Sequence, residues 1–225
     1  MWCVPALDDE YIAKMEDVLN LLARAYDERE PVVALDERPV QLLDSARPDL
    51  PGGPGRVARR DYEYIRCGTA NVYGIVEPKA GRHLTYATKN RKRAQFVAAM
   101  QRITTAYPKA KTIHIIMDNL NLHRESVLKQ VLGDDAGAAL WARFTPHYTP
   151  KHASWLNPAE IELSLWSREC VGGDRISELR ELRRRTSAWN ARANRLRRTI
   201  TWRFTTTEAR RVFRYQRSTM SRSEH

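Results

Sequence analysis

Long hydrophobic runs are missing from this 225-residue sequence, which contains no stretch of eighteen or more apolar residues. A membrane-spanning helix requires about 20 consecutive apolar residues, so none is expected. The first twenty residues also lack the basic and then apolar order of a secretory signal. We therefore expect a cytoplasmic protein that has no membrane partner.

Cysteine is also scarce, because the sequence has only Cys3, Cys67 and Cys170, far apart and without a CxxC pair. This pattern excludes a disulfide framework and a cysteine-based zinc site, and it predicts reduced thiols. No glycine-rich, phosphate-cradling motif opens a helix, which argues against a nucleotide cofactor. Internal repeats and coiled-coil heptads are likewise missing from the sequence.

The charge of the chain is unevenly distributed. Hydrophobic residues make up 42% and charged residues 29% of the sequence, as in ordinary folded domains. The formal net charge of +11 comes from the C-terminal part, because the residues from Arg175 onward include 15 arginines and four glutamates. Such a region favours a polyanionic partner such as DNA, the alternative being a solvated arginine-rich helix face.

The hydrophobic periodicity predicts alternating helices and strands. Helices are expected at 8–26, 91–107, 125–132, up to 143, from 158, at 176–198 and at 207–215. One strand or two strand segments are expected at 31–43, a two-stranded hairpin at 62–78, and further strands at 83–89, 111–119 and 144–150. The Pro- and Gly-rich segment 47–60 is predicted to be a loop.

This order predicts an α/β, ribonuclease-H-like fold, with a mixed five-stranded sheet flanked by helices and a helical, arginine-rich C-terminal extension. The predicted divisions are an N-terminal helix at 1–30, a catalytic domain at 31–172 and the basic extension at 173–225.

Three acidic residues occupy positions from which they could meet at one edge of this sheet. Asp36 interrupts an apolar strand, Asp118 ends another, and Glu160 lies in the first turn of a helix. Carboxylate oxygens suit Mg²⁺ or Mn²⁺, and two such ions can stabilise both oxygens of a phosphoryl transfer. Alternatively, the acids are ordinary edge residues and Glu160 closes a capping box with Asn157.

Longer strings of sequence support the first interpretation. PVVALDE, YEYIRCGTANVYGIVEP, IIMDNLNLH, HYTPKHASWLNPAEIELS and TWRFTTTEAR resemble, in this order, the DDE transposases of bacterial insertion sequences in the mariner-like superfamily, of the IS-six-thirty type. The resemblance implies that Asp36, Asp118 and Glu160 form a catalytic triad that holds two Mg²⁺ or Mn²⁺ ions. It further implies hydrolysis at a transposon end, attack of the freed 3′-hydroxyl on double-stranded target DNA, and a homodimer on DNA.

The residues around the triad include candidate DNA contacts. We predict backbone or base-stacking contacts for Asn119, Asn121, Lys151, His152 and Trp155, the alternative being that these residues structure their loops. The neighbouring Glu37 and Glu162 are expected to point away from the metals, because strand side chains alternate and helix positions two apart diverge. His114 is interpreted as a core histidine and His123 as a helix-start residue.

The sequence also departs from the family pattern. About thirty residues precede the first predicted strand, too few for the helix-turn-helix region that reads transposon ends in the family. We therefore expect a partial transposase, with a separate N-terminal helix-turn-helix polypeptide as one source of end recognition. Two alternatives stay open: a nuclease of the same fold without strand transfer, and a catalytically silent DNA-binding remnant.

Overall fold

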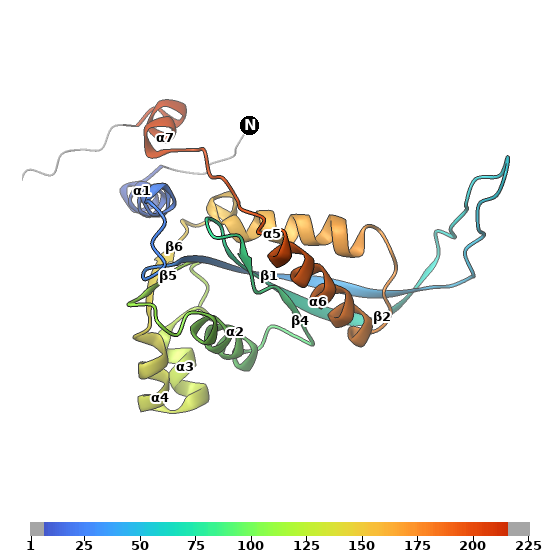
Figure 1. The fold of residues 1–225 in the computed structure, drawn as a ribbon, viewed down its shortest axis with the longest axis horizontal. Helices are drawn as coiled ribbons and strands as arrows, with labels where there is room; N and C mark the ends of the chain where they lie inside the picture. The colour runs from blue at the N-terminus through green and yellow to red at the C-terminus, as the bar shows by residue number, and fades with distance from the viewer. Residues whose placement is uncertain (1–6, 216–225) are drawn as a thin grey trace, which may run out of the picture.

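The computed structural model describes residues 7–215, which form one mixed sheet with helices on both faces (Figure 1). Cys3 lies outside the described residues. The elements are, in chain order, α1 (Asp9–Ala23), β1 (Val32–Ser45), β2 (Tyr64–Glu77), β3 (Arg82–His83), β4 (Tyr86–Thr88), α2 (Arg93–Ala106), β5 (Ile113–Met117), α3 (Glu125–Leu132), α4 (Asp134–Trp141), β6 (Phe144–Tyr148), the 3₁₀ turn η1 (Ser154–Leu156), α5 (Pro158–Trp166), the π-helical turn η2 (Ser167–Val171), α6 (Leu179–Arg195) and α7 (Thr206–Phe213).

The sheet has the strand order β3-β2-β1-β5-β6, and β4 also pairs with β2. β1 pairs antiparallel with β2 and parallel with β5, and β5 pairs parallel with β6. The α/β prediction is therefore confirmed. The predicted count of five strands is wrong, because the sheet of the described residues has six. The segment expected as one strand at 83–89 is divided into β3 and β4 by Leu84 and Thr85.

The predicted hairpin at 62–78 is also wrong, because this segment is the single long strand β2. Cys67 and Gly68, which the hairpin prediction places in the turn, instead mark an irregularity in the pairing of β1 and β2. The register between β1 and β2 shifts between Leu42 and Leu43, opposite Gly68, which has a φ of 120°. Glycine tolerates this backbone conformation, so the strand continues through the bulge.

The helices begin and end close to the predicted positions. The sequence predicts Asp8 or Asp9 as the cap of the first helix, and the Asp8 carboxylate accepts a hydrogen bond from the Tyr11 backbone at 2.7 Å. The sequence Asn157-Pro158 predicts a cap followed by the first helical residue, and both residues take these places in α5. The apolar residues expected on α5 were Ile161, Leu165 and Trp166; Trp166 is buried, whereas Ile161 is exposed.

The two faces of the sheet bury different side chains because strand residues alternate. One face presents Val33, Leu35 and Ile115 to α2. The other presents Ala34 and Ile116 to α1 and the start of α5, while α5 and α6 pack over β2 further along. No helix in the described part of the chain is long and apolar enough to cross a membrane.

The loop between β1 and β2 extends away from the body of the molecule as an arm, residues 46–63 (Figure 1). Two isolated bridges, Leu50 with Arg59 and Gly53 with Arg56, hold its two sides together. The prediction of a loop at 47–60 is confirmed.

The arginine-rich C-terminal segment is packed into the fold. Leu182, Trp189 and Ala193 of α6 are buried in a cluster with Trp166 of α5. The helical nature of the predicted extension is confirmed, although the segment shares the hydrophobic core of the sheet. The domain divisions at residues 30 and 172 stay predictions.

Candidate active site

The two aspartates of the predicted triad lie on neighbouring strands. β1 and β5 are parallel, and Ala34 is paired with Ile116. Asp36 lies two residues beyond Ala34 in β1, and Asp118 directly follows the last residue of β5, so both stand where the pairing of the two strands has ended. The Asp36 side chain belongs to the face covered by α1 and α5, because Ala34 belongs to it, and Asp118 lines a cavity together with Lys14 of α1.

Helix α5 is anchored beside Asp36 by Asn157. The Asn157 side chain accepts a hydrogen bond from the Ala159 backbone at 3.1 Å and donates one to the Leu35 carbonyl at 2.9 Å. One buried amide therefore caps the helix and fixes its first turn to the residue that precedes Asp36. Glu160 stands in this first turn, which brings it to the same edge of the sheet.

Gly74 permits the close approach of α5 to the sheet. It pairs with Asp36 across β1 and β2. A Cβ atom at this position would lie only 2.6 Å from Leu163 Cγ in α5, closer than atoms can approach. A side chain here would therefore force the buried Leu163 side chain, or the helix that carries it and Glu160, to shift.

The alternative role of Glu160 as the partner in a capping box does not fit the structure. The Asn157 backbone N–H, which a capping box would use, donates to the Ser154 carbonyl at 2.8 Å. The Glu160 carboxylate instead lies 3.7 Å from an Arg38 guanidinium nitrogen, and both side chains are about one-third exposed.

Asp36 lies near three other acidic side chains. Its pKa is raised to about 7, first by burial and then by the negative charges of Glu160, Glu37 and Asp118, while the hydrogen bond from the Glu37 backbone lowers it. Within residues 7–215, however, no three His, Cys, Asp or Glu side chains are arranged so that they could hold a metal ion as they stand.

The two neighbouring glutamates point away from this edge. Glu37 lies on the opposite face of β1 with its side chain 3% exposed. Glu162 is fully buried on the other side of α5, where its carboxylate lies 2.9 Å from His83 Nδ1 and accepts from the Thr85 hydroxyl at 2.6 Å. Their predicted orientation therefore agrees with the described geometry.

The buried residue that sequence reasoning missed is His123. Its ring is fully buried between Asp118, 2.6 Å from Nδ1, and Glu37, 3.4 Å from Nε2. Burial alone would lower the pKa of His123, but the two carboxylates outweigh it and raise the pKa to about 10. The available signal was its position five residues after Asp118. His114, in contrast, is the nearly buried histidine predicted, with hydrogen-bond contacts to Arg24 and His147.

The predicted DNA contacts fall into two groups. Asn119, Lys151 and His152 line a cavity of about 700 Å³ beside Asp118, together with Lys14 from α1. Asn121 is exposed outside this cavity. Trp155 packs edge-on against Phe204, with ring centroids 5.6 Å apart. Asn119, Lys151 and His152 therefore share one cavity with Asp118, whereas Trp155 has aromatic neighbours within its own chain.

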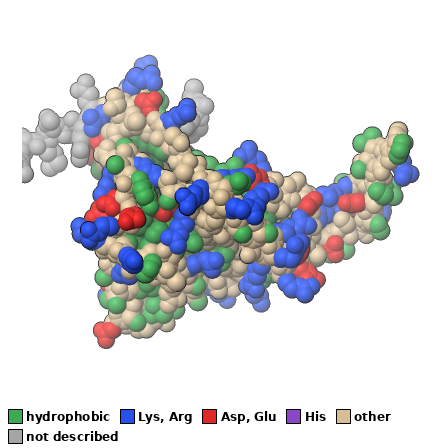
Figure 2. Space-filling model, viewed as in Figure 1, with side chains coloured by type: hydrophobic (Ala, Val, Ile, Leu, Met, Phe, Trp, Pro, Cys, Tyr) green, Lys and Arg blue, Asp and Glu red, His purple; other side chains and the backbone are tan. Residues whose placement is uncertain are grey.

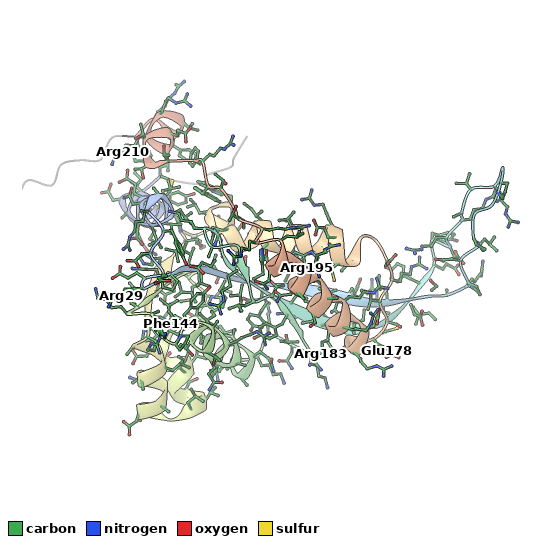
Figure 3. All side chains as sticks on the ribbon, viewed as in Figure 1. Arg29, Phe144, Glu178, Arg183, Arg195 and Arg210 are labelled. Carbon is green, nitrogen blue, oxygen red and sulfur yellow. The ribbon has the colours of Figure 1, made fainter. Side chains whose placement is uncertain are left out.

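Basic side chains spread over the face that carries α6 and reach the base of the arm (Figure 2). Part of this charge is neutralised within the chain, because Glu181 pairs with Arg184 and Arg185, and Glu169 pairs with Arg192 and Arg198. Arg183 and Arg195 lie on the exposed surface of α6 (Figure 3).

Comparison with known proteins identifies the family. Residues 31–183 match the model of the DDE superfamily endonucleases, which covers more than half of the chain. The chain belongs to the DDE superfamily endonucleases. This confirms the resemblance to DDE transposases at the level of the superfamily, while the insertion-sequence type stays a prediction. A search of curated proteins finds no match.

Solved structures of Mos1 mariner transposase share the fold of this DDE endonuclease. The Mos1 paired-end complex with Mn has a TM-score of 0.55 at 13% identity, and the pre-cleavage Mos1 transpososome has the same values. The Mos1 strand transfer complex has a TM-score of 0.52. The three matches cover 85–87% of this chain and 57–60% of the Mos1 chains, so this chain spans about three fifths of their length. The ribonuclease-H-like prediction is confirmed by this likeness.

Proposed function

We propose that this DDE endonuclease cleaves phosphodiester bonds of double-stranded DNA with divalent metal at Asp36, Asp118 and Glu160, and joins the freed 3′ end to target DNA. The observation that carries the proposal is that Glu160 and Asp118 lie near enough to Asp36 for their charges to raise its pKa. The three acids come from the first turn of α5, the end of β5 and β1.

The chemistry of the three side chains fits Mg²⁺ or Mn²⁺, because both ions prefer oxygen ligands and would neutralise the clustered negative charge. Two bound ions would supply activated water and stabilise the attacking and leaving oxygens. The contacts of the acids must change for this to happen. Glu160 has to leave Arg38, 3.7 Å away, and turn toward Asp36. The Mos1 structures in complexes with Mn and with Mg support the use of a divalent metal ion.

The other residues of the site would bind and orient the DNA. The cavity beside Asp118 offers Asn119, Lys151 and His152 as donors to a phosphate backbone. We propose that Asn121 and Trp155 contact the DNA outside this cavity. Trp155 would do so only where the part of its ring that is not packed against its aromatic neighbours reaches a base. Because the Mos1 structures are paired-end and strand transfer complexes, we propose that a homodimer of this chain pairs two ends. A separate helix-turn-helix polypeptide would supply end recognition.

Metal-dependent nicking of supercoiled DNA tests the cleavage step. Wild type is expected to nick with Mg²⁺ or Mn²⁺ and to lose this activity on chelation. Asp118→Asn and Glu160→Gln keep the size of the side chain and remove its charge, so each is expected to lower the rate at least 1000-fold. Glu125→Gln, which affects an acid paired with Lys129 on α3, serves as the control. Equal rates in the three variants would contradict the proposal.

Transfer of a labelled 3′ end into a second DNA molecule tests the joining step. Covalent joining by wild type is the expected result. Nicking without joining would identify a nuclease of the same fold. Salt-sensitive DNA binding without any metal-dependent cleavage would identify a silent remnant.

A further inference from the structure

His123 is held in a fixed position next to Asp118 and Glu37. It lies in the turn between β5 and α3, where its backbone N–H donates to the Leu120 carbonyl at 3.0 Å and its carbonyl accepts from the Tyr148 hydroxyl at 2.8 Å. Its ring packs against Phe96 with a centroid distance of 4.9 Å. The backbone and the ring are therefore held from several sides.

Both nitrogens of the His123 ring face carboxylates. Nδ1 lies 2.6 Å from Asp118 Oδ1 and 3.1 Å from the Asp118 carbonyl, while Nε2 lies 3.4 Å from Glu37 Oε2. The contact of Nδ1 with the Asp118 carbonyl fixes the ring, and its two nitrogens face the carboxylates of Asp118 and Glu37. The ring then bridges Asp118 at the end of β5 and Glu37 in β1.

This bridge constrains the geometry of the acids. Glu37 follows Asp36 directly and points to the hidden face of β1, so a contact with Glu37 also fixes the strand at Asp36. On the other strand, the contact through Oδ1 leaves Oδ2 of Asp118 as the oxygen available to a metal ion. A residue that contacts a metal ligand without touching the metal orients that ligand, and its loss typically costs about 10- to 100-fold in metal affinity.

We propose that His123, supported by Glu37, is a positioning residue that holds the Asp118 carboxylate in the orientation required for metal binding. The inference rests on the proposed function of the three acids. It adds a role for two buried residues that would not themselves contact DNA or metal.

Mn²⁺ binding to the full chain provides the test, with free Mn²⁺ measured by its electron paramagnetic resonance signal. His123→Phe keeps a ring and removes both donors, and it is expected to weaken Mn²⁺ binding at least tenfold. His123→Asn keeps a donor near the Nδ1 position and should restore part of the affinity. Glu37→Gln, on the hidden face, should weaken binding to an intermediate degree.

His114→Asn is the matched control, because it replaces a nearly buried histidine of β5 that contacts Arg24 and His147. It is expected to lower the thermal midpoint as His123→Asn does, while Mn²⁺ binding stays at the wild-type value. If His123→Phe does not fold, the comparison of His123→Asn, Glu37→Gln and His114→Asn decides the question.

Wild-type affinity in the folded His123 and Glu37 variants would overturn this inference alone, provided that Asp118→Asn has lost Mn²⁺. Equal losses of affinity in His114→Asn and the His123 variants would also overturn it, because the effect would then be one of general stability. A wild-type chain that binds no Mn²⁺ would overturn both this inference and the proposed function.

Discussion

Single residues at this site carry two roles at once, and Asn157 illustrates this best. The resemblance singled out the string that contains it, and the Asn-Pro pair predicted a helix cap, which the structure confirms. The second role, the hydrogen bond to the Leu35 carbonyl, joins residues 122 positions apart and has no local sequence signal. His123 was missed for the same reason, because Glu37 and Asp118 meet it only after β1 and β5 have paired.

Asn157→Ala is expected to lower the free energy of unfolding by about 2 kcal/mol, since it removes a helix cap and leaves a buried carbonyl without its donor. Urea unfolding measures the change. Asn119→Ala, at an exposed position, should change stability by less than about 0.5 kcal/mol. A loss at Asn157 as small as this would show that the Leu35 contact does not hold α5 in place.

At the scale of elements, periodicity predicted where helices and strands lie but not how long each strand continues. β5, buried along its whole length, and α2 were predicted well because their patterns are unambiguous. The hairpin at 62–78 was wrong because Gly68 can serve either a turn or a bulge, and pairing with β1 decides between them. Likewise, the buried face of α5 depends on β2, which meets Leu163.

Two glutamates within one turn of helix α5 have different expected roles: Glu162 in stability and Glu160 in activity. Glu162 is fully buried and joined to His83 and Thr85, whereas the Glu160 side chain is 37% exposed. Glu162→Gln is therefore expected to cost about 3 kcal/mol of stability by breaking a buried network. Glu160→Gln should cost little stability and abolish nicking. Thermal unfolding and nicking assays on both variants check this, and a reversed pattern would contradict the assignment of Glu160.

The packing of α5 on β2 gives a second prediction at this scale. Gly74→Ala introduces a methyl group 2.6 Å from Leu163 Cγ, so the buried Leu163 side chain must shift, and we expect helix α5 to shift with it. A displacement of about 1 Å at the reacting groups can lower a rate by about 100-fold. We expect such a loss of nicking in a variant that still folds. Gly53→Ala, whose added methyl group would meet no atom within 4 Å, is the control for stability.

At the scale of the whole molecule, the sequence predicted where the positive charge lies, but not which acidic side chains pair with it or which of its residues are buried. A deletion of the arginine-rich segment from Ile176 onward is unsuitable as a test of DNA binding, because it removes the buried Leu182 and Trp189. Charge must be changed on the exposed surface instead. Ion pairs with Glu169 and Glu181 also reduce the charge that α6 offers to DNA.

Arg183 and Arg195 on α6 are expected to contact phosphates. Changing both to Gln should weaken DNA binding and reduce the slope of log affinity against log salt by about 2, roughly one unit for each lost phosphate contact. Fluorescence anisotropy over a range of salt concentrations measures this slope. Lys109→Gln with Lys111→Gln, on the exposed loop before β5, should leave the slope within experimental error. An unchanged slope in the arginine variant would place the DNA on another surface.

Locating Mn²⁺ in crystals by its anomalous scattering shows whether three acids from separate elements hold divalent metal. We expect density between Asp36, Asp118 and Glu160, with Glu160 turned away from Arg38 and His123 still in contact with Asp118. Mn²⁺ bound elsewhere in a protein that still nicks DNA, with Glu160 left on Arg38, would contradict it.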